Sequence, residues 1–152
     1  MIMNYNVIDK IDVFDIIRHI KDPEFPKTLE ELKVVNEDWI TVIDFDKNNN
    51  NDELNDNGNK ENVNNGYCFI KILFQPTVPH CHLAPTIALC IREKIKEYLP
   101  KRSKIEIYIK PGTHQTEDEI NKQINDKERI IAALENPEIF QLVKKCIKED
   151  DY

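Results

Sequence analysis

The strongest constraint on the fold is an Asn-rich tract that separates two β-rich runs. Residues 47–66 contain ten Asn in twenty residues. Such a composition buries too little apolar surface to offset the entropy of ordering the chain, so we expect a disordered insert there. The flanking runs, residues 39–45 and 67–74, are rich in β-branched and aromatic side chains. We therefore expect these runs to form an antiparallel hairpin, with the insert as its enlarged loop.

Apolar spacing predicts one helix on each side of this hairpin. The first helix can be capped by Asp12 and is stopped by Asp22-Pro23. A capping box at residues 28–31 predicts a short helical turn after it. The second helix is expected over residues 82–99, because apolar residues keep helical spacing there and Pro85 suits a first turn.

The C-terminal third of the chain is expected to contain one strand and two helices. The strand covers residues 104–110, and a second capping box, at residues 116–119, opens a helix that reaches Leu134. Within that helix, the densely polar stretch 121–129 suggests a binding surface, although a solvated face is the usual explanation for a charge-rich helix. Asn136-Pro137 starts the last helix. The order α-β-β-α-β-α-α indicates an α+β fold: a two-layer sandwich with a small three-stranded sheet and helices on one face.

Length and composition restrict the functional classes. The 152 residues suit a single domain, residues 1–152, with the insert inside it. A net charge of −7 argues against a dedicated nucleic-acid binder. No apolar run approaches the roughly 20 residues that span a bilayer, and no secretory leader is visible. We therefore expect a cytoplasmic or nuclear protein with no direct contact to membranes or nucleic acids.

Cysteine usage agrees with that location. The four cysteines, Cys68, Cys81, Cys90 and Cys146, have irregular spacing and no C-x-x-C pair. This argues against a disulfide framework and against a paired-cysteine zinc site, so we expect reduced thiols. Cys68, Cys90 and Cys146 fall on apolar faces of the predicted elements and are expected to pack there.

Cys81 is different, because it stands between His80 and His82 just before a predicted helix. Backbone amides and the helix dipole favour a thiolate there, which predicts a reactive or metal-binding cysteine. A metal site would need a further ligand from elsewhere: His114, Asp22 or Glu24. One alternative is a thiol enzyme with Cys81 as nucleophile and His80, His82 or His114 as base. Another is a purely structural interaction module in which Cys81 is inert.

Five motifs occur together and in order: DPE at 22–24, TLEEL at 28–32, FQPTVPHC at 74–81, GTH at 112–114 and INKQINDKER at 120–129. In combination they closely resemble the eukaryotic cytosolic iron–sulfur assembly component 2 proteins, which are MIP18-like members of the domain-of-unknown-function-59 superfamily. The resemblance runs from Ile11 to Ile147 and skips the insert. It implies the compact α+β fold of that family.

The resemblance also implies a function. Such proteins are subunits of the cytosolic iron–sulfur targeting complex, and they act as adaptors or cluster-transfer factors and not as enzymes. The implied partners are a WD40-propeller subunit, a large helical-repeat adaptor and iron–sulfur apoproteins of the cytosol and nucleus, with a homodimer left open. The reactive cysteine of the family corresponds to Cys81. Its other motifs correspond to five residues: Asp22, Pro23, Glu24, Thr113 and His114.

No stably bound cofactor is implied, since a cluster would be transient cargo and zinc adventitious; the candidate metal ligands are Cys81 and His114. The chain departs from the family pattern at His82, where a small hydroxyl residue is usual, and at Pro85, where Thr is common. Residues 105–109 and 120–129 are similar to the branch with iron-regulatory clients. Residues 111–114 are similar to the branch for general client maturation.

Overall fold

The computed structural model describes residues 7–45, 67–77, 83–99 and 101–148. The expected insert at 47–66 and the segment His80-Cys81-His82 lie outside the described residues. The elements follow in this order: α1 (Lys10–Ile17), η1 (Glu37–Trp39), β1 (Ile40–Asp44), β2 (Tyr67–Phe74), α2 (Ala84–Tyr98), β3 (Arg102–Ile109), α3 (Glu117–Ile124), α4 (Lys127–Glu135) and α5 (Pro137–Ile147).

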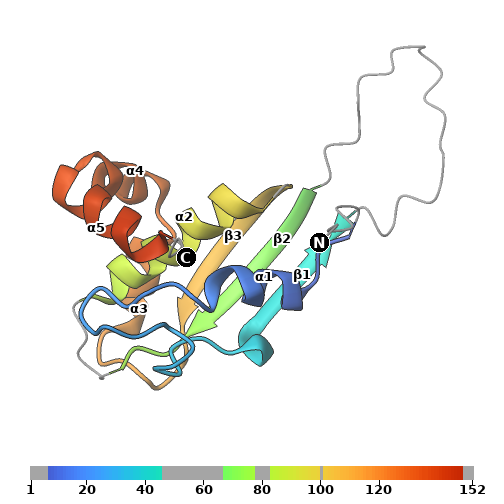
Figure 1. Ribbon diagram of the computed structural model, residues 1–152, viewed down its shortest axis with the longest axis horizontal. Helices are drawn as coiled ribbons and strands as arrows, with labels where there is room; N and C mark the ends of the chain where they lie inside the picture. Colours follow the sequence, from blue (N-terminus) through green and yellow to red (C-terminus); the bar gives the residue numbers. More distant parts are fainter. Residues whose placement is uncertain (1–6, 46–66, 78–82, 100, 149–152) are drawn as a thin grey trace, which may run out of the picture.

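The three strands form one mixed sheet in the order β1-β2-β3 (Figure 1). β1 and β2 are antiparallel, with Val42 opposite Ile70, which confirms the hairpin expected on either side of residues 47–66. β2 and β3 are parallel, with Ile70 opposite Ile105, and α2 lies in the crossover between them. Because β2 and β3 point the same way, the segments that leave them start at the same end of the sheet.

One face of the sheet carries the hydrophobic core. Four side chains of β2 are fully buried on this face: Cys68, Ile70, Ile72 and Phe74. α1 and α2 lie over this face (Figure 1), and α2 adds three buried isoleucines, Ile87, Ile91 and Ile95. Each fully buried aliphatic side chain contributes about 1.5–3 kcal/mol. α5 packs on α2, and α4 packs on α5. The predicted α+β two-layer sandwich is confirmed.

The start of the first helix differs from the expected one. Asp9, and not Asp12, is the N-cap, because its carboxylate accepts a hydrogen bond from the Asp12 N–H at 3.0 Å. The Asp12 carboxylate accepts one from the Asp9 N–H at 3.1 Å, so Asp12 is the third-position partner of a reciprocal capping box. The capping box at 28–31 is confirmed: Thr28 Oγ1 accepts from the Glu31 N–H at 3.2 Å, and the Thr28 N–H donates to Glu31 Oε1 at 3.3 Å.

The single helix expected from residue 116 to Leu134 is in fact two helices, α3 and α4. Asn125 ends α3 and turns its amide to β3: Oδ1 accepts from the Ile107 N–H at 3.0 Å, and Nδ2 donates to the Ile107 carbonyl at 2.8 Å. One turn earlier, Asn121 Oδ1 accepts from the Ile109 N–H at 2.8 Å. The interpretation of this polar stretch as a solvated face holds for Lys122 and for residues 126–129, which are exposed. It fails for Asn121 and Asn125, which cover the open edge of β3.

The helix caps in this region differ from the single capping box expected at residues 116–119. Asp126 begins α4, and its carboxylate accepts from the Glu128 N–H at 2.9 Å. Thr116, the expected capping-box residue of α3, makes no side-chain cap hydrogen bond. Its Oγ1 lies 3.4 Å from His114 Nδ1 instead, so the histidine ring competes with the helix for this hydroxyl.

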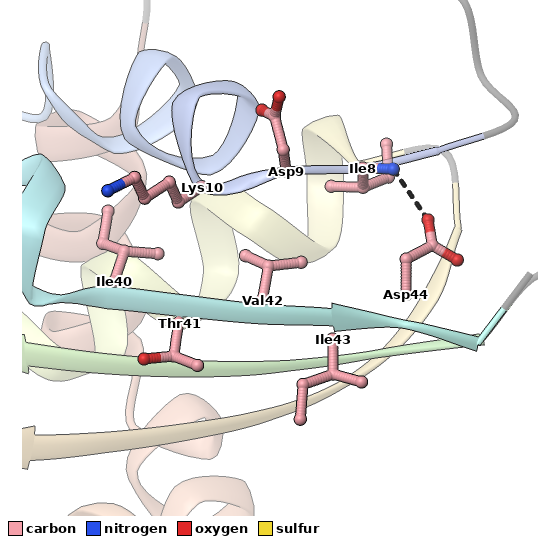
Figure 2. A pocket seen from close by; sticks show the side chains of 8 residues that line it. All are labelled: Ile8, Asp9, Lys10, Ile40, Thr41, Val42, Ile43 and Asp44. Atoms are coloured by element: carbon pink, nitrogen blue, oxygen red, sulfur yellow. Dashed lines mark hydrogen bonds between the residues drawn. The ribbon is translucent and has the colours of Figure 1, made fainter. Parts of the chain in front are cut away.

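A buried carboxylate, that of Asp44, lies at the end of the sheet where β1 ends and β2 begins. Asp44 Oδ2 accepts hydrogen bonds from the Ile8 N–H at 2.7 Å and from the Lys101 ammonium at 2.9 Å. The Asp44 and Lys101 side chains are only 1% and 7% exposed. Figure 2 shows residues 8–10 running along β1, with the bond from Ile8 to Asp44 at the end of the strand. Asp44 therefore ties the N-terminal segment, β1 and the start of β3 together.

Candidate functional site

The structure describes four of the predicted site residues and the chain on both sides of the others. The four are Asp22, Glu24, Thr113 and His114. Residues 75–77 leave β2 toward Cys81, and Leu83 precedes α2 after it. The surroundings of the cysteine can therefore be built from these flanks, while the geometry of Cys81 itself stays a prediction.

The turn after β3 lies beside the segment that leaves β2 (Figure 1). The Lys110 N–H donates to the Phe74 carbonyl at 2.8 Å, which continues the parallel pairing one residue beyond β3. On the other side, the Gln75 N–H donates to the Val34 carbonyl at 2.8 Å. The structure thus brings the loop after residues 28–32, the segment after β2 and the turn at 110–114 to one end of the sheet.

A groove of about 760 Å³ runs along residues 75–77. It is also lined by Phe14 of α1, by residues of the chain before η1 and by Trp39. The Lys110 ammonium lies 4.1 Å from the centroid of the Trp39 ring, a cation–π contact that joins the turn after β3 to this groove. Sequence reasoning missed this contact, because Trp39 and Lys110 are brought together only by the pairing of the strands.

Asp22 holds the DPE turn together. Its Oδ1 accepts from the N–H groups of Glu24 at 2.8 Å and Phe25 at 3.0 Å, and its own N–H donates to the Lys27 carbonyl at 2.9 Å. Pro23 fixes the backbone angle that starts such a turn. Asp22 is buried, whereas Glu24 is exposed and Phe25 is 41% exposed. The Asp22 carboxylate therefore positions the turn, and Glu24 and Phe25 are presented to solvent.

The turn at Thr113 and His114 is also fixed by local hydrogen bonds. Gly112 has a φ of 82°, a left-handed conformation that suits glycine. Thr113 Oγ1 donates to the Lys110 carbonyl at 2.6 Å, and His114 Nδ1 accepts from the Thr116 N–H at 3.1 Å. Because Nδ1 is an acceptor, the neutral ring carries its proton on Nε2. In this tautomer Nε2 is a hydrogen-bond donor and not a base.

The start of α2 offers backbone amides without a side-chain cap. Leu83 is the N-cap residue, and its aliphatic side chain has no acceptor. Pro85 lies in the first turn and has no N–H, so the early amide donors belong to its neighbours, Ala84 and Thr86. The positive end of the helix dipole thus directly follows the segment that contains Cys81.

The other three cysteines are buried free thiols, as predicted: Cys68, Cys90 and Cys146. Cys90 lies in α2 and Cys146 in α5, and these two helices pack together. Interaction with the Cys146 side chain, together with burial, raises the pKa of the Cys90 thiol. Interaction with the Cys90 side chain lowers the pKa of the Cys146 thiol, although burial opposes the change.

The described residues contain no cluster of three or more His, Cys, Asp and Glu side chains able to hold a metal ion. Only His114 of the candidate pair Cys81 and His114 is described, so that pair stays a prediction. In the described part of the chain, no helix is long and apolar enough to cross a bilayer.

Comparison with known proteins decides the family. The chain is 90% identical over 152 residues to "MIP18 family protein FAM96A" of Dictyostelium discoideum, covering 100% of both chains. The chain belongs to the MIP18 family. It is 40% identical over 143 residues to "Cytosolic iron-sulfur assembly component 2B" of the same organism, covering 93% of this chain and 75% of that relative. A mouse protein of that name is 40% identical over 140 residues, with 92% and 73% covered.

No protein-family model matches the chain. Membership of the MIP18 family nevertheless confirms the resemblance inferred from the five motifs. The identity of 90% to the FAM96A-named relative, against 40% to the 2B-named relative of the same organism, groups the chain with the first of the two.

Proposed function

We propose that the chain is a subunit of the cytosolic iron–sulfur targeting complex and helps to transfer iron–sulfur clusters to apoproteins of the cytosol and nucleus. Two relatives are named cytosolic iron–sulfur assembly component 2B, which supports a role in that process. The observation that carries the proposal is the convergence of three segments at one sheet end: the loop after TLEEL, the segment leading to Cys81 and the turn at His114.

In this proposal Cys81 is a transient thiolate ligand of the cluster, which is cargo and not a resident cofactor. The amides and the dipole at the start of α2 favour the thiolate. His114, with its proton on Nε2, is suited to donate a hydrogen bond to a thiolate or to a cluster sulfide. Transfer then exchanges one thiolate ligand for another, with no net oxidation.

The same tautomer argues against His114 as the base of a thiol enzyme. A base for Cys81 needs an unprotonated ring nitrogen, and Nδ1 of His114 already accepts the Thr116 N–H. His80 and His82, the other bases of that alternative, lie outside the described residues. We propose an adaptor without catalytic turnover. Its partners are the WD40 propeller, the helical-repeat adaptor and iron–sulfur apoproteins, which would contact the groove along residues 75–77 and the exposed Glu24 and Phe25.

The test is affinity purification of the tagged full chain from cells, combined with iron loading of client proteins. The wild-type chain should recover the propeller, the helical-repeat subunit and apoproteins from the cytoplasm, with a nuclear fraction. Cys81→Ala should reduce client iron loading severalfold while partner recovery and circular dichroism stay unchanged. Cys68→Ala is the matched control, because that thiol lies toward the opposite end of β2.

Two results would count against the proposal in different ways. Failure to recover any of these partners would remove the assignment to the targeting complex. Normal client loading by Cys81→Ala, with partners still recovered, would leave the purely structural interaction module as the better description.

A further inference from the structure

A second groove, of about 580 Å³, lies where β3 begins. Its lining comes from α2, from the start of β3 with the residue before it, and from α4. We call it the basic groove. β3 runs from this groove to the turn at 110–114, at the other end of the sheet (Figure 1). The basic groove is therefore separate from the candidate site, and the proposed function does not use it.

The lining of the basic groove is strongly cationic. The described residues that line it include no acidic side chain and five basic ones: Arg92, Lys96, Lys101, Arg102 and Lys127. The whole chain carries a net charge of −7, so this groove has the opposite sign to the molecule as a whole. Such segregation of charge favours an anionic ligand at this place.

Two of the five cations also hold the fold together. Lys101 pairs with the buried Asp44. The Arg92 guanidinium donates to the Ile105 carbonyl at 2.8 Å and to the Ile124 carbonyl at 2.9 Å. Carbonyl oxygens carry no net charge, so these bonds fix the guanidinium in place without neutralising it. Arg92 therefore supplies a permanent positive charge to the groove.

The other three cations are available to a ligand. Lys96, Arg102 and Lys127 are exposed, and none of them forms an ion pair with another described residue. They belong to α2, β3 and α4, so their charges are distributed over three elements. This distribution suits several carboxylates along a chain better than one compact anion.

Isoleucines line the basic groove between its cations. Ile105 and Ile130 are half-buried, and Ile131 is 57% exposed. A ligand with an aliphatic side chain would remove this apolar surface from water, which is favourable by about 25 cal/mol for each Å². No aromatic side chain is present among the described lining residues, so the groove offers no platform for stacking bases. The lining thus fits an acidic peptide better than a nucleic acid.

We propose that the basic groove binds an acidic segment of a partner protein, in which Asp or Glu residues flank an aliphatic side chain. The carboxylates would pair with Lys96, Arg102 and Lys127, and the guanidinium of Arg102 can hold a carboxylate with two parallel hydrogen bonds. The aliphatic side chain would pack on Ile131 and its neighbours. Electrostatic complementarity of this kind accelerates association and selects the partner. The inference does not depend on cluster transfer.

The test titrates a short fluorescein-labelled peptide, with glutamates on both sides of a leucine, with the purified full chain and follows fluorescence anisotropy. We expect saturable binding that weakens as salt is added, because salt screens charges on the surface. A peptide with glutamine in place of every glutamate should not bind. In an isotope-labelled chain, the acidic peptide should shift the amide resonances of residues 127–131.

The decisive variant carries Lys96→Glu, Arg102→Glu and Lys127→Glu, and its affinity should fall about tenfold or more. Arg92 and Lys101 are left unchanged, because they hold the fold. The matched control reverses three exposed lysines outside the groove, Lys27, Lys122 and Lys145. It has the same net charge and should keep most of the affinity. Circular dichroism checks both variants, and the amide shifts of the wild-type chain decide if the first one unfolds.

Several outcomes would overturn the proposal. Equal weakening in both triple variants would show an effect of net charge and not of this groove. Equal binding of the glutamine peptide, or tighter groove-dependent binding of a DNA oligonucleotide of equal charge, would remove the acidic segment as the ligand. Tyr67, which follows the Asn-rich tract, pairs with Arg102. Binding that appears only after residues 47–66 are replaced with Asn-Gly would make the chain itself the occupant.

Discussion

At the scale of single residues, burial decides how much a charged pair contributes to stability. Arg18 and Glu30 form a bidentate pair with two bonds of 2.7 Å, yet their side chains are 34% and 37% exposed. Asp44 and Lys101 form one bond of 2.9 Å, but both side chains are almost fully buried. Water screens the first pair and cannot replace a missing partner in the second.

Asp44→Ala should therefore lower the free energy of unfolding by about 3–5 kcal/mol, because it leaves the buried Lys101 ammonium and the Ile8 N–H without this acceptor. Asp44→Asn keeps an acceptor for the Ile8 N–H. Its free energy of unfolding should therefore lie between those of the wild type and Asp44→Ala. Glu30→Ala is the control and should cost about 0–1 kcal/mol. Urea titration of the three variants measures the difference; similar losses for Asp44→Ala and Glu30→Ala would contradict the argument.

At the scale of elements, local patterns predicted what local forces decide. Hydrophobic and β-branched patterns located the three strands of the described residues, and the capping box at residues 28–31 is confirmed. The prediction failed where a distant partner competes with the helix. The polar stretch after residue 116 reads as one helix, but Asn125 bonds to β3 and breaks it. No pattern within the stretch marks that partner, which lies 18 residues away in sequence.

Asn125→Ala tests whether this amide holds α3 against the sheet edge. The change removes bonds to both backbone groups of Ile107, so the free energy of unfolding should fall by about 2–3 kcal/mol. Lys122→Ala, on an exposed position of the same helix, should stay within about 0.5 kcal/mol of the wild type. Hydrogen exchange gives a second readout: the Ile107 amide should lose protection in Asn125→Ala only. Unchanged protection would mean that the asparagine does not cover the edge.

At the scale of the whole molecule, the candidate site divides into a part that the sequence predicts and a part that only the fold creates. The cysteine, its two histidines and the following helix are neighbours in the chain, so local reasoning found them. The approach of residues 75–77 to the turn at 110–114 depends on the parallel pairing of β2 and β3, which hydrophobic spacing does not specify. The packing of α5, which carries Cys146, on α2, which carries Cys90, is also a tertiary contact that no local rule contains.

The pairing of β1 with β2 leads to a prediction for the Asn-rich tract between them. The pairing is described up to Asp44 opposite Cys68, and the rings of Phe45 and Tyr67 stack with centroids 5.7 Å apart. Replacing residues 47–66 with Asn-Gly, a favoured hairpin turn, should preserve this register. A shorter loop loses less entropy on closure, about 0.6 kcal/mol for each halving of its length, so the variant should be more stable by about 1–2 kcal/mol.

Thermal melting and recovery of the partner subunits measure the two consequences of that replacement. A second variant, with a Gly/Ser tract of the same length, separates the effect of loop length from the effect of sequence. It should match the wild-type chain in both measurements, because the flanking strands set the register. If both variants lose partner recovery while remaining folded, the Asn-rich sequence itself makes functional contacts; if both melt early, it contributes to the fold, and the view of a dispensable hairpin loop is wrong.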